Sequence, residues 1–497
     1  MKILAVFTLT VLIGSTKDQG PRRQQDIPDK PEDLKYKPLR YDVPDPSKMR
    51  TELPCGSVLY ALEDRSLPKV DITIYVRGGS FWEDAGKEGV AAITGTLMRI
   101  GGTATRKPNE LDDELDFLAA QLSVSIGETN GAASLSLLSK DLDRGLEILF
   151  DVLRSPGFAE DKLDLTKKQI LERLKSRNDA TASIEGREAN LLLYGDYPIN
   201  RHPTGASVQS ITQADLKALH ARFFEPWNFI IAASGDFRKA DLAQKLEKAM
   251  AGWGGAKRAL PPVPKPAHEP KPGIYCFHKE GANINQGRVT VQHLGIDLHH
   301  ADLYPLRVLN YIFGAGSFSS RLMQRVRTEM GLAYDVRSEF RPQFLYPGWM
   351  RMSFQSKSET CALALKTCLD ELDKVRKDSV TEEELASAKQ FYVDAFPALF
   401  FENAAKTVAT FASAELNGYP KNYYQTYRDK ITGVTRDDIK RAANTLLHPD
   451  KFVVVVAGNI PVIKAGDGKV KLADLERPIE DVPLPDPVTL ERPKPKQ

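Results

Sequence analysis

The chain has 497 residues, which is too many for one ordinary hydrophobic core and suits two to four domains. Its 68 Lys and Arg nearly balance its 66 Asp and Glu, so the net charge of +2 excludes the strongly basic character of a nucleic-acid-binding protein. The 42% of hydrophobic and 27% of charged residues are typical of a folded globular protein, four cysteines are too few for a disulfide scaffold, and no apolar run reaches the ~20 residues of a membrane span.

The N-terminus has the pattern of a secretory signal peptide. Lys2 is followed by an apolar run at residues 3–13 and by the small residues 14–16, although no Ala-x-Ala cleavage site is present. We therefore expect a signal peptide at residues 1–16 and a periplasmic or secreted protein. A buried N-terminal strand or a short anchor is the alternative interpretation.

Three proline-rich segments divide the rest of the chain. Residues 17–49 are polar and indicate an extended arm, and residues 259–272 contain six prolines and indicate a stiff linker. Residues 471–497 are charged and proline-rich and predict a tail along the surface. Between these segments lie two blocks, 50–258 and 273–470, each of which we predict to be a domain.

The two blocks end in matching segments. Residues 211–235 align without a gap with residues 434–458. Both begin with a Thr-x-x-Asp cap signature, continue as an amphipathic helix that a proline ends, and finish as an apolar, β-branched run typical of a buried strand. Such matching units indicate a duplicated domain, with chance similarity of two ordinary helix–strand units as the alternative.

Strands and helices come in runs within each block. Residues 70–76 alternate between apolar and polar side chains and predict a strand with one polar face. We predict a hairpin over 122–128 and 133–139, helices at 143–154 and 159–178, strands at 288–294 and 349–355, and helices at 301–313, 360–376 and 381–395. Because strands and helices do not alternate strictly, this order favours an α+β fold over a doubly wound α/β fold.

The most informative segment runs from Gly314 to Tyr334. It contains a glycine-rich turn with Gly316, then a helix, and then a strand that leaves after Gly331. Free backbone N–H groups at the start of a helix can bind an anion, but no phosphate-loop Lys-Ser/Thr pair follows this turn. On the residues alone, surface salt bridging by Arg327 and core packing by Tyr334 remain the simpler interpretations.

This segment resembles the second-half motif of the pitrilysin/insulinase (inverzincin) metallopeptidase family, in the branch of mitochondrial processing peptidase and two-subunit bacterial peptidases. Gly314 and Gly316 match the glycine-rich turn of the family, and Arg327 and Tyr334 match its Arg and Tyr. The resemblance covers roughly residues 50–470. It implies two tandem homologous domains, each a curved, mostly antiparallel sheet flanked by helices, that form half of a clamshell around a peptide.

The resemblance also implies roles for these residues. In the two-subunit members, one subunit holds zinc, and the other supplies the Arg and the Tyr across a shared chamber. A guanidinium and a phenol can bind the peptide backbone and oppose negative charge on the scissile carbonyl. Gly314, Gly316, Arg327 and Tyr334 are therefore expected to bind substrate, with Arg327 and Tyr334 supporting the transition state.

The zinc motif of the family, His-x-x-Glu-His on a helix with a distal Glu, is degenerate in the first block. Ala92 and Thr96 stand at the two His positions, Gly95 stands at the position of the catalytic Glu, and Glu172 falls where the distal ligand would be. One carboxylate does not hold zinc, and the eight histidines form no replacement His-Glu-x-x-His. We therefore expect no metal, no cofactor and no complete catalytic site in this chain, and zinc in a partner subunit.

Taken together, the resemblance implies a non-zinc subunit of a secreted or periplasmic heterodimeric zinc metallopeptidase, inactive alone but contributing to metalloendopeptidase activity. Its expected partners are a zinc-bearing homologous peptidase subunit and peptide substrates, with no nucleic acid and no membrane span. The alternative is a catalytically inert peptide-binding or assembly protein of the same fold, for which a homodimer is the expected form. An enzyme of unrelated chemistry is the third interpretation.

Overall fold

The structure is a computed structural model that describes residues 41–255, 257–281 and 284–493. The expected signal peptide at residues 1–16, and residues 17–40 of the expected arm, lie outside the described residues. The chain divides into two compact units after Asp42, and every element described below belongs to the second unit. No helix in the described ranges combines the length and the apolar character needed to cross a lipid bilayer.

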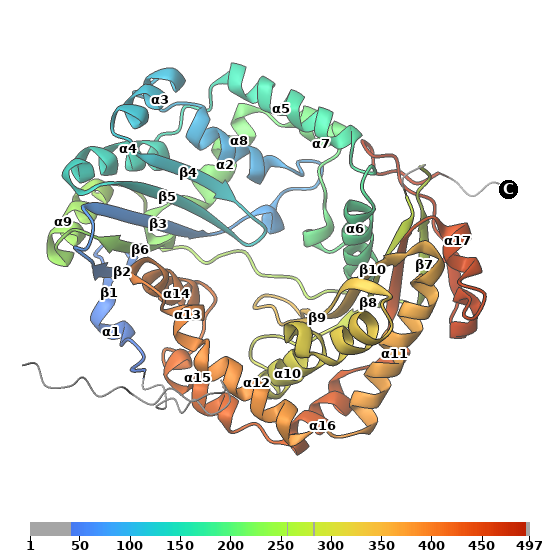
Figure 1. The fold of residues 1–497 in the computed structure, drawn as a ribbon. Coiled ribbons are helices and arrows are strands. Elements are labelled where there is room, and N and C mark those ends of the chain that lie inside the picture. The colour runs from blue at the N-terminus through green and yellow to red at the C-terminus, as the bar shows by residue number, and fades with distance from the viewer. Residues whose placement is uncertain (1–40, 256, 282–283, 494–497) are drawn as a thin grey trace, which may run out of the picture. The chain divides into compact units, whose positions relative to one another are not determined.

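A six-stranded sheet forms the centre of the first block (Figure 1). Its strand order is β1-β2-β6-β3-β5-β4, and all neighbours are antiparallel except the parallel pair β2 and β6. Alternate residues of β3 are buried from Val70 to Val76, as the sequence pattern predicts. The strands are β1 (Arg50–Glu52), β2 (Val58–Glu63), β3 (Lys69–Arg77), β4 (Gln121–Ile126), β5 (Asn130–Leu138) and β6 (Phe229–Gly235).

Amphipathic helices cover this first sheet. Leu146, Leu149 and Leu153 lie on the buried stripe of α4, in one continuous core with the strands. Each such fully buried leucine contributes about 1.5–3 kcal/mol. The helices that follow the sheet strands are α2 (Val90–Ile100), α3 (Pro108–Phe117), α4 (Leu142–Arg154), α5 (Glu160–Lys175), α7 (Gly205–Ser210), α8 (Gln213–Phe223) and α9 (Lys239–Met250).

The second block repeats this topology. Its sheet has the order β12-β7-β11-β8-β10-β9, in which the last five strands take the places of β2, β6, β3, β5 and β4, including the parallel pair. The predicted α+β fold of two homologous, mostly antiparallel halves is therefore confirmed. The strands are β7 (Gly273–His278), β8 (Gln286–Leu294), β9 (Ala333–Arg341), β10 (Trp349–Lys357), β11 (Val453–Gly458) and β12 (Ile479–Asp481).

The matching ends of the two blocks fold alike. Thr212 caps α8 by accepting a hydrogen bond from the N–H of Asp215, and Thr435 caps α16 in the same way from Asp438.

The helix predicted at 301–313 begins as α10 and continues as the π-helical turn η6. The helices of this block are α10 (Leu303–Asn310), η6 (Tyr311–Ala315), η8 (Met323–Glu329), α11 (Cys361–Lys377), α12 (Glu382–Asp394), α13 (Phe396–Phe400), α14 (Ala404–Leu416), α15 (Tyr423–Thr432), α16 (Arg436–Leu446) and α17 (Ile460–Ala465).

One helix of each block packs on the sheet of the other block (Figure 1). Helix α6 (Thr181–Tyr194) of the first block contacts β8 and β11 of the second sheet. Its buried Glu185 accepts hydrogen bonds of 2.6 Å from Arg288 Nε and from Thr290 Oγ1. These charge-assisted hydrogen bonds compensate the burial of the carboxylate and fix α6 on the second sheet.

Helix α14 makes the reciprocal contact, from the second block to β2 and β6 of the first sheet. Its Glu415 accepts hydrogen bonds from Arg50 Nη2 at 3.1 Å and from the Tyr60 hydroxyl at 2.8 Å. Phe411, one turn earlier on α14, stacks on the Tyr60 ring. The two blocks are consecutive in sequence, but each core is completed by a helix of the other block.

The proline-rich segments differ from one another in the structure. Residues 259–272 contain no helix or strand. The expected arm ends in α1 (Pro46–Met49), and Met49 is buried, so its last turn belongs to the fold. The expected tail also contributes to the fold, because β12 pairs in parallel with β7 and forms the partly exposed sixth strand of the second sheet. Its proline-rich composition hides this strand, since the pairing of β12 uses backbone groups rather than an apolar run.

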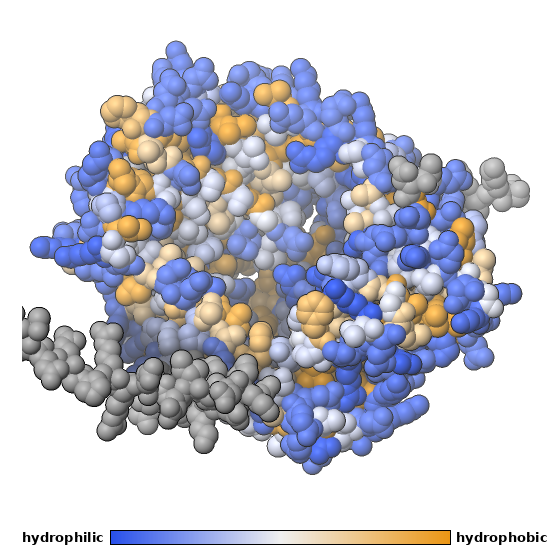
Figure 2. All heavy atoms as spheres, viewed as in Figure 1, coloured by the Kyte–Doolittle hydropathy of each residue, from blue (hydrophilic) through white to orange (hydrophobic). Residues whose placement is uncertain are grey.

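The face of the molecule shown in Figure 2 is mostly hydrophilic, with apolar residues in separate small patches. Isolated apolar side chains are ordinary on a protein surface and mark no site by themselves. A candidate site must therefore be found from the positions of particular side chains.

Candidate functional site

The Arg and Tyr of the sequence motif lie together at the last strand of the second sheet. Helix η8 carries Arg327, and this helix ends at Gly331, whose φ of +63° suits glycine and whose N–H donates to the Arg327 carbonyl at 3.0 Å. Strand β9 begins two residues later, so Tyr334 is its second residue. A short helix-to-strand turn therefore brings the two side chains side by side.

The guanidinium of Arg327 lies against two aromatic rings. Its Cζ is 4.4 Å from the centre of the Tyr334 ring and 4.6 Å from the centre of the Phe318 ring. Tyr334 is 81% exposed and Phe318 is 57% exposed, so all three side chains reach solvent. Stacking uses the flat faces of the guanidinium, and within the described residues no ion pair occupies its edge. Its N–H donors thus remain open to a ligand.

Phe318 is the member of this cluster that the sequence analysis did not identify. It lies in the short turn η7 (Ser317–Ser319), and an isolated aromatic residue in a polar turn carries no periodic signal. Only the fold reveals its role, because the turn after η6 brings the Phe318 ring to within 4.6 Å of the Arg327 guanidinium.

The two glycines of the motif are buried and act through packing. A Cβ at Gly314 would lie 2.4 Å from Ser338 N on β9, and a Cβ at Gly316 would lie 2.6 Å from the Tyr311 carbonyl oxygen. Only glycine lets η6 approach β9 this closely. Gly314 and Gly316 therefore shape the chain around the Arg327 cluster, and their direct contact with a substrate stays a prediction.

The positions of the family's zinc motif lie on α2, which packs on β4. Ala92 and Thr96 share one exposed face, and the Thr96 hydroxyl donates to the Ala92 carbonyl at 3.0 Å. Gly95 lies on the buried side, where a Cβ would be 2.8 Å from Ile126 N. This helix face presents a methyl group and an already bonded hydroxyl where metal ligands would stand.

Glu172 does not join these positions in a metal site. It is exposed on α5, and its carboxylate pairs with Lys175 Nζ at 2.7 Å. Among the residues that the structure describes, no three His, Cys, Asp or Glu side chains are arranged to hold a metal ion.

A buried carboxylate anchors the start of α2. Glu83 is 6% exposed and accepts hydrogen bonds from the N–H of Gly89 at 3.1 Å and of Ala91 at 2.7 Å. Burial raises the pKa of Glu83 to about 7, although these hydrogen bonds act in the opposite direction. Glu83 therefore holds the helix in place rather than facing a substrate.

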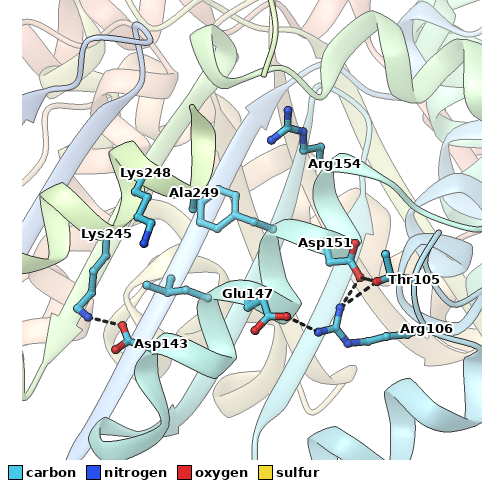
Figure 3. A pocket seen from close by; sticks show the side chains of 11 residues that line it. Thr105, Arg106, Asp143, Glu147, Asp151, Arg154, Lys245, Lys248 and Ala249 are labelled. Atoms are coloured by element: carbon cyan, nitrogen blue, oxygen red, sulfur yellow. Dashed lines mark hydrogen bonds and ion pairs between the residues drawn. The ribbon is translucent and has the colours of Figure 1, made fainter. Parts of the chain in front are cut away.

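A groove of about 700 Å³ lies away from the Arg327 cluster, between α4 and α9 (Figure 3). Several of its charged groups pair with one another, whereas no ion pair among the described residues engages Arg154 or Lys248. Arg106 donates to Glu147 at 2.9 Å and to Asp151 at 2.5 Å, and Lys245 pairs with Asp143. Ion pairs therefore neutralise the acidic groups at the rim, and Arg154 and Lys248 leave the groove with a slight excess of positive charge.

A smaller cavity of about 260 Å³ is lined by both blocks and by the linker. Aromatic and apolar side chains dominate, with one guanidinium, and such a lining suits an apolar peptide side chain. The lining includes Arg77, Trp82, Leu260, Val263, Phe344 and Tyr346.

Comparisons with known proteins agree with this architecture. Residues 59–191 match the family model described as Insulinase (Peptidase family M16), and residues 210–392 match the model described as Peptidase M16 inactive domain. The chain belongs to peptidase family M16. The resemblance to pitrilysin/insulinase-type metallopeptidases is thereby confirmed; the first match lies within the first block, and the second runs from the end of the first block into the second.

Relatives within family M16 carry different names. An uncharacterized zinc protease of Mycobacterium tuberculosis (strain ATCC 25618 / H37Rv) is 25% identical over 406 residues, 80% of this chain and 90% of the relative. A non-peptidase homologue of Helicobacter pylori (strain ATCC 700392 / 26695) is 24% identical over 400 residues, 79% of this chain and 90% of that protein. A crystal structure of an M16 inactive domain from Pseudomonas fluorescens matches with a TM-score of 0.73 and 27% identity, over 82% of this chain and 97% of that one. This chain is an M16-family peptidase-like protein.

Proposed function

We propose that this M16 chain is the non-zinc subunit of a heterodimeric zinc metallopeptidase, and that Arg327 and Tyr334 complete the active site of its partner. The observation that carries the proposal is the contrast between two helices. Arg327 is half-buried with open N–H donors, whereas the metal positions of α2 hold Ala92, Gly95 and Thr96. The apolar N-terminal segment supports a periplasmic or secreted location.

The chemistry assigned to this chain is binding and charge stabilisation. Arg327 presents planar donors and Tyr334 presents a hydroxyl, and both can donate to a peptide carbonyl as it gains negative charge. Zinc in the partner would polarise that carbonyl and activate the attacking water. Tyr334 also lies near the start of β9, the last strand in the order of its sheet, so an extended peptide can pair along β9 and reach Arg327.

Two π-helical turns, η6 and η8, adjoin this cluster and support a functional role. Such turns are rare and are frequently found at functional sites, because they redirect side chains at a cost in regular hydrogen bonding. Here they flank the Phe318 turn and carry Arg327 itself.

The test is peptide cleavage by this chain co-purified with a zinc-bearing homologue. Arg327→Ala combined with Tyr334→Phe is expected to lower kcat/KM by about 10²–10³-fold while the zinc content of the complex stays the same. Arg325→Ala is the matched control, because Arg325 lies on the same helix but pairs with Glu329. Full activity of the double variant in an intact complex would contradict the proposal.

The second candidate is a catalytically inert peptide-binding or assembly protein of the same fold. The aromatic cavity between the blocks favours it, because that cavity can hold an apolar side chain without any metal. Isolation from the native source distinguishes the two candidates. A partner whose sequence contains His-x-x-Glu-His supports the heterodimer, and a stable homodimer that binds unfolded peptides supports the inert protein.

A further inference from the structure

A cluster of basic side chains, in which Arg187 is buried and Arg177 and Arg492 are half-buried, lies where the C-terminal segment crosses α6. Glu188 of α6 is 0% exposed. One of its oxygens accepts hydrogen bonds from Arg187 Nε at 2.9 Å and Nη2 at 2.8 Å, and the other accepts from Arg492 Nη2. A single carboxylate therefore compensates two guanidinium groups.

Arg177 adds a third positive charge to this cluster. It follows α5, and its Nη2 donates to the Pro203 carbonyl at 2.5 Å. Burial and then the positive charge of Arg187 lower the pKa of Arg177, so the two guanidinium groups are close enough to repel each other. In the described part of the chain, no carboxylate pairs with Arg177. Three arginines share one carboxylate, and two positive charges are left without compensation.

Several N–H and N atoms of the cluster are also left without hydrogen bonds. Arg177 Nη1, Arg187 Nη1 and His202 Nε2 are buried and have no hydrogen-bond partner among the described residues. Burial and the charges of Arg177 and Arg187 lower the pKa of His202, which places its ring in the same electrostatic environment. Buried donors without partners are rare in folded proteins and indicate an unseen acceptor.

The C-terminal segment covers this cluster. The Asn178 amide donates to the Pro485 carbonyl at 2.7 Å, the N–H of Gly205 donates to the Val488 carbonyl at 2.9 Å, and Arg492 Nη1 donates to the Pro483 carbonyl at 2.6 Å. Residues 483–492 are thus held on the loops that carry the open donors.

We propose that a small inorganic oxyanion of the phosphate or sulfate type binds between Arg177, Arg187 and His202, beneath the C-terminal segment. Guanidinium donors match the oxygens of such an anion in geometry and in charge. A water molecule could accept from the same donors, but it would leave the two excess positive charges uncompensated. The site involves neither Arg327 nor Tyr334, and it stands independently of the peptidase proposal.

Thermal unfolding of the full chain with increasing inorganic phosphate tests this site, with sodium chloride holding the ionic strength constant. Wild-type protein is expected to show a saturable rise in Tm of about 2 °C or more, because the anion binds only the folded state. Arg177→Gln is expected to abolish the rise. Arg173→Gln, an exposed arginine on α5, is the matched control and should retain it. A rise that does not saturate, or an equal rise in Arg177→Gln, would overturn the proposal.

Two measurements on the wild-type protein keep the proposal testable if Arg177→Gln does not fold. Titration calorimetry with phosphate should give one site per chain. A crystal soaked in selenate should show an anomalous peak between Arg177 and Arg187. Absence of measurable heat together with a water molecule at this position would rule out the anion site.

Discussion

The helices that cover β4 in the first sheet and β9 in the second hold corresponding places in the two halves, but they present different chemistry. Helix α2 offers the Ala92 methyl and a Thr96 hydroxyl bonded to its own helix. The elements on β9 offer Arg327 against two exposed rings. Both keep a glycine where the helix meets the strand, Gly95 in one half and Gly314 in the other.

This difference separates what the fold requires from what a site requires. In both halves a glycine lets the helix pack closely on the neighbouring strand, and both halves keep that glycine. The side chains that point away from this packing can vary without disturbing it. In the first half they are Ala92 and Thr96, whereas the second half carries the charged, planar guanidinium of Arg327 with open donors. The four predictions that follow test this separation.

The largest expected effect is that of Arg327→Lys in the complex with a zinc-bearing partner. Lysine keeps the positive charge but loses the planar group that stacks against Phe318 and Tyr334, and we expect kcat/KM to fall by about 10²-fold. Thr96→Ala in the first half should change kcat/KM by less than about twofold, because its hydroxyl bonds only to its own helix. If Arg327→Lys and Thr96→Ala changed kcat/KM equally, the second half would contribute no more to catalysis than the first.

The second prediction concerns the dependence of stability on pH through Glu83. Its pKa of about 7 in the folded protein lies above its ordinary value of 4.5, so the folded state holds this proton more tightly than the unfolded state. The resulting stabilisation is complete below about pH 4.5 and is lost as the pH rises through about 7. Urea unfolding at about pH 5 and about pH 8 should show wild type losing up to about 3 kcal/mol through this group. Glu83→Gln should lose correspondingly less, and identical pH profiles would contradict the assignment.

The third prediction is that Gly95→Ala and Gly314→Ala destabilise the protein to similar extents. In each case the added Cβ meets a backbone nitrogen of the neighbouring strand, at 2.8 Å and 2.4 Å. Overpacking of this kind costs about 1–3 kcal/mol, which chemical denaturation can measure. Gly186→Ala on α6 is the control, because nothing lies within 4 Å of its added Cβ. If only one of the two substitutions destabilised the protein, close packing of helix on strand would depend on glycine in that half alone.

The smallest expected effect is that of Phe318→Leu. Leucine removes one of the two rings that hold the Arg327 guanidinium but leaves the second ring in place. A cation–π contact at an exposed site contributes about 0.5–1 kcal/mol, so kcat/KM in the complex should fall by about two- to fivefold. Unchanged kinetics would indicate that Tyr334 alone positions the guanidinium.

Local patterns in the sequence predict much of this fold. The alternation at residues 70–76 predicts β3, and the capping signatures at Thr212 and Thr435 predict α8 and α16 and, through them, the duplication. Each of these features is decided by neighbours in sequence, namely side-chain period and hydrogen bonds within a helical turn. The pairing of Arg327 with Tyr334 was predicted from the family resemblance, since on the residues alone surface salt bridging and core packing were the simpler interpretations.

Features that depend on distant contacts were not predictable. Glu185 and Glu188 give α6 a polar appearance, yet both are buried by partners more than a hundred positions away, Arg288 and Arg492. Strand β12 likewise depends on an edge provided by β7. Phe318 becomes informative only when the fold places Arg327 beside it. The burial and the role of these residues depend on tertiary contacts, which a local sequence pattern does not contain.

The reciprocal placement of α6 and α14 bears on how such a chain arose. Two copies of a single half-length ancestor that exchanged one helix each would have formed a symmetric pair with the same contacts. Gene fusion would then have joined the copies through the segment at residues 259–272 without altering either core. A chain nicked in that segment should accordingly stay associated and melt in one transition, since each fragment still holds a helix that the other needs.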